Sequence, residues 1–213
     1  MDTTFDLNPC MEVKTEVFRN SNIYIIDNFY KNPRLVLDFF EKRPPVRHKP
    51  QLPEGLPSFN HLHFYDDRHI VDTEIVSPVY NFLSKLCDQK PMHSDNKITT
   101  NRFKFCRTGF NTYRHSYWHP HKDYGYNGIV YLNDDHVYGT NLYNREKPKS
   151  GISAEHYNPW QLKENWTIIN FLKPQFNRCV LFDGKLFYHG MHIPGERYFD
   201  DEYRLNQAFF FKE

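Results

Sequence analysis

His121 and Asp123 stand at a spacing that would let both side chains bind one metal ion. They lie in YWHPHKDYGYNGIVYLN, residues 117–133. Residues two apart in an extended segment point to the same side, so the imidazole and the carboxylate can face the same ion. A turn that contains glycine and the apolar run GIVYLN follow, and they predict a strand directly behind the pair.

A second His-x-Asp pair, His93 and Asp95, has the same spacing. A chain with this many histidines and aspartates is expected to contain such a pair by chance. The second pair lies in KPMHSDNK, a polar connector with no apolar strand behind it. We therefore assign the metal to His121 and Asp123.

His189 is the third ligand that we expect. It follows NRCVLFDGKLFY, two apolar runs joined by Asp183-Gly184, which predicts a histidine on a late strand. Two histidines and one carboxylate leave positions on an ion open, as in non-haem iron oxygenases, whereas a closed structural zinc site usually uses cysteine. His192 could replace His189, and His119 also has same-face spacing with His121.

The histidines of NHLHFYDD, His61 and His63, have no evident set of partner ligands. Surface or satisfied core histidines are the default interpretation for them.

A co-substrate that carries a carboxylate group would need a cationic side chain to bind it. Arginine suits this role because its planar guanidinium group pairs with both carboxylate oxygens. Arg204 begins the apolar run RLNQAFFF and could supply that group.

The elements that position these residues are predicted to be mainly strands, after helices near the N-terminus. We expect a strand over 22–26, a helix over 32–43, a Pro-rich loop over 44–60 and a second helix over about 68–88, with a break or kink near Pro78. Further strands are expected over 98–107, 128–133, 140–144, 166–172, 178–183, 186–190 and 203–212. The segment 145–165 is a candidate lid. This order predicts a mainly β protein, a jelly-roll sandwich with helices on one face.

Composition excludes several classes of protein. The net charge is +1, with 27 basic and 26 acidic residues, so nothing favours a nucleic-acid partner. The four cysteines form no Cys-x-x-Cys pair, no apolar stretch is long enough for a membrane span, and the N-terminus does not look like a signal peptide. We expect a cytoplasmic protein. Motifs of serine hydrolases, zincins and nucleotide-binding folds are absent.

The succession HPHKD, GIVYLN, GTNLY, NRCVLFDGKLFYHG and YRLNQAFFF resembles the 2-oxoglutarate/iron(II) dioxygenase superfamily, in particular its prolyl-hydroxylase-like branch. The resemblance covers roughly residues 99–213. The opening NIYIIDNFYKNPRLVLDFF resembles small bacterial and phage-type members. The resemblance to the superfamily implies one domain over 1–213. Residues 1–97 would form a strand and supporting helices, and residues 98–213 would form a double-stranded β-helix, the cupin-like jelly roll.

The resemblance also implies roles for particular residues. His121, Asp123 and His189 would bind Fe(II), and Arg204 with Tyr131 would hold the far carboxylate of 2-oxoglutarate. The segment CRTGF, residues 106–110, resembles the strand and Gly turn before the first histidine, so Arg107 would approach the co-substrate. The family's basic residue usually lies closer to the distal histidine than Arg204 does, which leaves Arg197 as the alternative.

The implied activity is hydroxylation of a C–H bond with Fe(II), 2-oxoglutarate and O2, supported by ascorbate. The substrate would be a peptidyl proline, an amino acid or another small metabolite. The carboxylate of Asp123 favours hydroxylation, because related halogenases lack it. The alternatives are a cupin-like jelly roll that binds a metal or ligand without oxygen chemistry, and a nucleic-acid demethylase, which the neutral charge disfavours.

Overall fold

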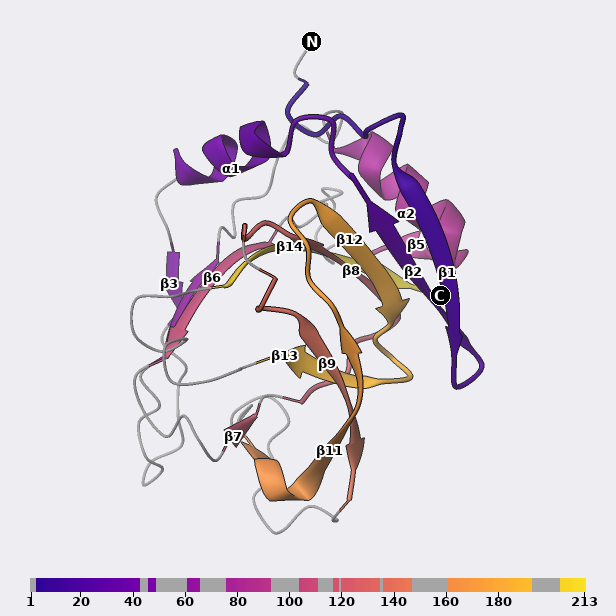
Figure 1. The fold of residues 1–213 in the computed structure, drawn as a ribbon, viewed down its shortest axis with the longest axis vertical. Coiled ribbons are helices and arrows are strands. Elements are labelled where there is room, and N and C mark those ends of the chain that lie inside the picture. Colours follow the sequence, from indigo (N-terminus) through magenta and orange to yellow (C-terminus); the bar gives the residue numbers. More distant parts are fainter. Residues whose placement is uncertain are drawn as a thin grey trace.

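The chain folds into antiparallel β-sheets with few helices, which confirms the predicted mainly β class (Figure 1). The computed structural model describes residues 3–42, 46–48, 61–65, 76–92, 104–110, 117–118, 120–134, 136–146, 161–192 and 204–213. None of the helices in these ranges is long and apolar enough to span a membrane.

The largest sheet in the described part of the chain has nine strands. Eight of them run in the order β1-β2-β12-β8-β14-β6-β4-β3, and β5 pairs with β14. The bounds are β1 Glu12–Phe18, β2 Ser21–Asp27, β3 Val46–His48, β4 His61–Tyr65, β5 Lys90–Pro91, β6 Lys104–Phe110, β8 Tyr126–Tyr131, β12 Arg178–Asp183 and β14 Arg204–Lys212.

A smaller sheet of three strands has the order β11-β9-β13. Its strands are β9 Thr140–Arg145, β11 Trp166–Leu172 and β13 Tyr188–Met191. A two-stranded ribbon joins β7 Tyr117–Trp118 to β10 Gln161–Leu162, and the 3-10 turn η1 Lys163–Asn165 follows. The Tyr131 hydroxyl of the large sheet lies 2.9 Å from Thr140 Oγ1 of the small one, so a hydrogen bond links the two layers.

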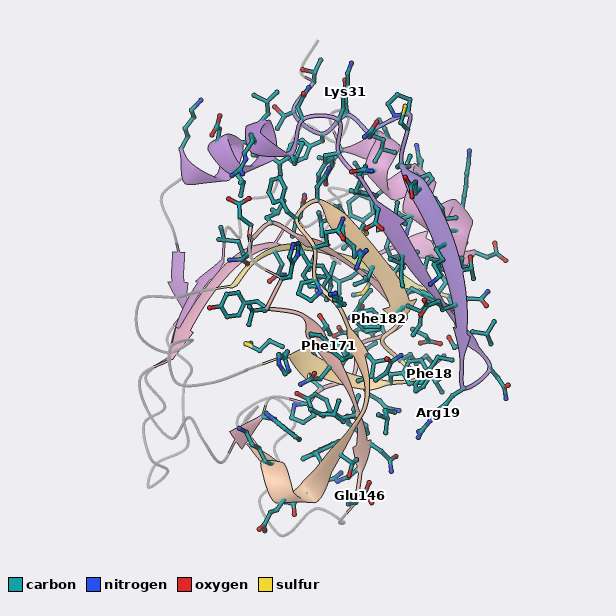
Figure 2. All side chains as sticks on the ribbon, in the orientation of Figure 1. Phe18, Arg19, Lys31, Glu146, Phe171 and Phe182 are labelled. Carbon is teal, nitrogen blue, oxygen red and sulfur yellow. The ribbon has the colours of Figure 1, made fainter. Side chains whose placement is uncertain are left out.

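Two apolar cores lie on opposite faces of the large sheet. Alternate residues of a strand point to opposite faces, so β8 supplies Val130 to one core and Ile129 and Tyr131 to the other. The helices α1 Pro33–Glu41 and α2 Ser77–Cys87 pack into the first core. The second core lies between the sheets, where Figure 2 shows Phe182 among the side chains.

Most predicted elements are confirmed, with shifts at their ends. The helix predicted over 32–43 is α1, and the apolar runs of the second half of the chain are strands. The break or kink predicted near Pro78 coincides with the start of α2, because Pro78 lies in the first turn of this helix, where its missing N–H costs no hydrogen bond. Residues 68–75 of the predicted helix lie outside the described ranges.

Other predictions for loops need correction. The predicted Pro-rich loop over 44–60 contains a strand, since β3 pairs with β4. The predicted Gly turn in CRTGF is wrong, because Gly109 lies within β6. Strand β1 was not predicted; its sequence, EVKTEVF, mixes charge with apolar residues, as suits an edge strand. Most of the candidate lid over 145–165 lies outside the described ranges.

Gly125, in the loop before β8, lies in close contact with the backbone of β14. A Cβ atom on Gly125 would lie 2.5 Å from the carbonyl oxygen of Phe211 and would overlap the Gln89 amide oxygen. The neighbouring backbone cannot yield as a flexible side chain can, so the loop that carries Asp123 would have to move.

We expect Gly125→Ala to lower the free energy of unfolding by about 1–3 kcal/mol, as overpacking typically does. Urea denaturation monitored by circular dichroism measures the loss. Gly128→Ala is the matched control, because its nearest neighbour is the flexible Leu83 Cδ1 at 3.2 Å. An equal loss in the control would contradict this role of Gly125.

Candidate metal centre

The backbone brings His121 and His189 side by side. They form an isolated antiparallel bridge between the segment before β8 and strand β13. The His121 N–H donates to the His189 carbonyl at 3.0 Å, and the His189 N–H donates back at 2.9 Å. This pair of hydrogen bonds fixes both Cα positions, so the two imidazoles start from a shared framework.

The turn between β12 and β13 positions Asp123. The Asp123 N–H donates to the Gly184 carbonyl at 2.9 Å, and the Gly184 N–H donates to the Gly125 carbonyl at 2.9 Å. These bonds hold the Asp123 backbone against the segment that leads to His189. All three predicted ligands are thereby attached to the same junction of two sheets.

The three side chains converge at distances that suit one ion. One ligand atom from each of His121, Asp123 and His189 lies within 4.8 Å of the other two. The His189 Nε2 atom is 3.3 Å from Asp123 Oδ2. Two ligands bound about 2.0–2.2 Å from one ion at right angles lie roughly 3 Å apart, so this separation fits a shared metal.

The hydrogen bonding of His189 leaves Nε2 for the centre. Its side chain is buried, and Nδ1 lies 3.1 Å from the Phe187 carbonyl oxygen, which can only accept. Nδ1 therefore carries a hydrogen. The lone pair of Nε2 then faces Asn127 Nδ2 at 3.0 Å and would be available to a cation. A backbone carbonyl that fixes the tautomer in this way is typical of metal-binding histidines.

The Asp123 carboxyl is held as an anion. Burial acts to raise its pKa, but the hydrogen bond with His189, the charges that His189 and His121 can carry and the hydrogen bond from Asn127 outweigh burial. The net effect places the pKa of Asp123 well below its ordinary value. A carboxylate that stays ionised is ready to bind a divalent cation.

Asn127 is the residue of this centre that was not predicted. Its side chain is buried, and its Nδ2 atom donates a short hydrogen bond to Asp123 Oδ2 and lies 3.0 Å from His189 Nε2. Within the described part of the chain, its Oδ1 atom is buried without a hydrogen-bond partner. The alternation of β8 carries the signal, because Asn127 shares a face with Ile129 and Tyr131. The strand predicted over 128–133 began too late to include it.

Two rings pack closely against the His189 imidazole. The rings of His121 and His189 lie 4.3 Å apart, and the Phe182 ring meets His189 edge-on at 5.0 Å. Packing of this kind limits the rotamers of His189 and keeps water from its buried side. Two imidazole nitrogens and one carboxylate oxygen form a donor set that suits a divalent transition metal such as Fe(II).

Tyr131 is buried in the second core, and its hydroxyl lies 2.9 Å from Thr140 Oγ1 and 3.3 Å from the Leu172 carbonyl. The backbone of β14 pairs Asn206 with Tyr131, Leu205 with Arg107 and Arg204 with Thr108. The side chains of Arg204 and Arg107 lie outside the described part, so their predicted contacts with 2-oxoglutarate remain predictions.

The alternative ligands divide into two groups. His93, Asp95, His119 and Arg197 lie outside the described residues, as do the side chains of His61 and His63. His192 is described, and its Nδ1 lies 3.2 Å from the Asn141 side-chain oxygen while its ring packs on Phe171 at 4.7 Å. It is not among the three residues grouped for a metal in the described ranges, which leaves His189 as the better third ligand.

No protein-family model matches the sequence, and no curated protein is significantly similar to it. The function of the chain therefore has to be inferred from its motifs and from the geometry of this centre.

We expect His121→Ala, Asp123→Ala and His189→Ala each to weaken the binding of a divalent metal sharply, because each removes one of three converging ligand atoms. Titration of the metal-free protein with Fe(II) or Co(II) measures the affinity. His192→Ala is the matched control and should bind as the wild type does. If His192→Ala lost the metal and His189→Ala did not, the assignment of the third ligand would be wrong.

Proposed function

We propose that the chain is an Fe(II)- and 2-oxoglutarate-dependent dioxygenase that hydroxylates a C–H bond of a peptidyl proline, an amino acid or a small metabolite. The observation that carries the proposal is the convergence of His121, Asp123 and His189 at the junction of two sheets. Two imidazoles and one carboxylate on one side of an ion leave its other side open, which is the arrangement of non-haem iron oxygenases.

The strand order supports a double-stranded β-helix as the fold. Strands β12, β8, β14 and β6 are neighbours in the large sheet, whereas β11, β9 and β13 form the small sheet and His121 extends it beside β13. The chain crosses between the layers as it passes along these segments. Two facing antiparallel layers of four segments are the arrangement of a jelly roll.

The side chains of the centre suit this chemistry. Bound Fe(II) would supply the reaction with O2 that converts 2-oxoglutarate to succinate and carbon dioxide and oxidises the substrate. Asp123 offsets part of the charge of the cation, and the Phe187 carbonyl holds His189 in the tautomer that offers Nε2. Phe182 packs edge-on against His189 and holds the ring of this proposed ligand in place.

The co-substrate's far carboxylate is proposed to lie near Tyr131 and Arg204. The Tyr131 hydroxyl is buried and already donates to an oxygen of the small sheet, so the same hydrogen can turn to a carboxylate oxygen. Arg204 stands two residues from Asn206, which pairs with Tyr131. We place the reaction in the cytoplasm, with a peptide or small-molecule partner, and the near-neutral net charge disfavours nucleic acid.

Formation of succinate from 2-oxoglutarate tests the proposal. The iron-loaded protein with ascorbate and O2 should convert 2-oxoglutarate to succinate, and His121→Ala should not, because its site lacks one imidazole ligand. A cupin-like binding protein would hold iron equally well and produce no succinate in either form. Succinate formation by His121→Ala at the wild-type rate would show that His121 is not a ligand.

Arg204→Ala should weaken 2-oxoglutarate binding at least about 30-fold, because truncating one partner of a buried charge pair costs several kcal/mol. Tyr131→Phe should cost less, about 0.5–1.5 kcal/mol for one neutral hydrogen bond. The metal-to-ligand charge-transfer band of the anaerobic iron-loaded protein reports the titration. Arg197→Ala is the comparison variant, and a large loss there with none in Arg204→Ala would reverse the assignment.

A further inference from the structure

We infer that Asn127 is a positioning residue of the metal centre, and that its carboxamide nitrogen holds the Asp123 carboxylate in the orientation that a metal requires. The inference rests on the proposed function because it takes the centre of His121, Asp123 and His189 to bind a metal. It adds a residue that is not a ligand and through which the affinity for the metal is set.

Asn127 reaches the centre from the second position of β8. It shares a face with Ile129 and Tyr131, which line the core between the sheets. Only 3% of its surface is exposed. Its Nδ2 atom donates a short hydrogen bond to Asp123 Oδ2 and lies 3.0 Å from His189 Nε2. One amide group thus touches two of the three proposed ligands.

The hydrogen bond to Asp123 can persist when a metal is bound, whereas the contact with His189 cannot. The Nε2 atom of a neutral imidazole has one lone pair, which the metal would occupy. A carboxylate oxygen has room for both an ion and a hydrogen-bond donor. Asn127 therefore acts on the centre through Asp123, by fixing which oxygen faces the ion. Outer partners of this kind orient metal ligands and tune affinity.

The other half of the amide shows that packing does not explain the asparagine. Its Oδ1 atom is buried and has no hydrogen-bond partner among the residues that the structure describes, which opposes folding. A leucine of similar shape would avoid that cost and suit the apolar neighbours Ile129 and Phe182. The Nδ2 group is the part of the side chain with polar partners, and both are proposed metal ligands.

Gly184 makes room for this amide. A Cβ atom on Gly184 would lie 2.8 Å from Asn127 Nδ2 and 2.9 Å from Asn127 Cγ. The same glycine binds the backbone of Asp123 through its carbonyl oxygen. An alanine here would push the amide out of place while the asparagine itself remains, which gives a second and independent perturbation.

Titration of the metal-free protein with Co(II), followed by its visible absorption bands, tests the inference without any need for turnover. Asn127→Leu should bind Co(II) about 10- to 100-fold more weakly, the usual cost of losing an outer partner, and should shift the bands because the carboxylate turns. Gly184→Ala should also weaken Co(II) binding and should shift the absorption bands in the same direction. Asn127→Ala serves in addition if either variant fails to fold, as judged by near-ultraviolet circular dichroism.

Asn141→Leu is the matched control. Asn141 is also a buried asparagine, and both ends of its amide have partners: Nδ2 donates to the Tyr143 hydroxyl and Oδ1 lies near His192 Nδ1. It pairs with Gly190, so it lies beside the centre rather than within it. It should lose stability while its Co(II) affinity and absorption bands stay as in the wild type.

The outcomes separate this inference from the proposed function. If Asn127→Leu binds Co(II) with the affinity and spectrum of the wild type, Asn127 does not position Asp123 and the inference alone is overturned. Tighter binding of Co(II) by Asn127→Leu also overturns the inference. In that case the amide would only donate to Asp123 in place of the metal, and it would compete with the metal rather than prepare the site for it. A wild-type protein that binds no Co(II) overturns both.

Discussion

The pair of backbone hydrogen bonds between His121 and His189 is the contact on which the centre depends. These bonds join the segment before β8 to strand β13, which follows β12 in the sequence. Strands β8 and β12 pair along six residues each, so both ends of the bridge are attached to one rigid pair. The positions of the two imidazoles are therefore set by the sheet register rather than by a flexible loop.

The same junction shows how a buried charge is accommodated. Removing the Asp123 carboxylate from water is unfavourable, and the structure offsets this with Asn127 and His189. The compensation is incomplete, because Asn127 Oδ1 has no hydrogen-bond partner in the described ranges. Local imperfections of this kind are expected where a site serves chemistry rather than stability.

The sequence was most informative where apolar runs are long and flanked by turn residues. Strands such as β8, β12 and β14 are confirmed for this reason, and the spacing of His121 and Asp123 could be interpreted because a strand follows it. Prediction failed where local chemistry is ambiguous. Strand β1 has charged residues along an exposed edge, and β3 lies among prolines. Asn127 was not predicted because its role depends on contacts with Asp123 and His189, and these contacts form only in the folded chain.

Pairing register also bears on the two arginines proposed for the co-substrate. Residues directly opposite each other in neighbouring strands share a face of the sheet. Asn206 is opposite Tyr131, so these two positions share a face of the sheet. Arg204 lies two residues before Asn206 on the same strand, so its register position is on that face as well. Arg107 is opposite Leu205, which packs against the core that the helices cover. Since a single strand alternates between faces, the register favours Arg204 over Arg107 as the partner of a carboxylate held between the sheets.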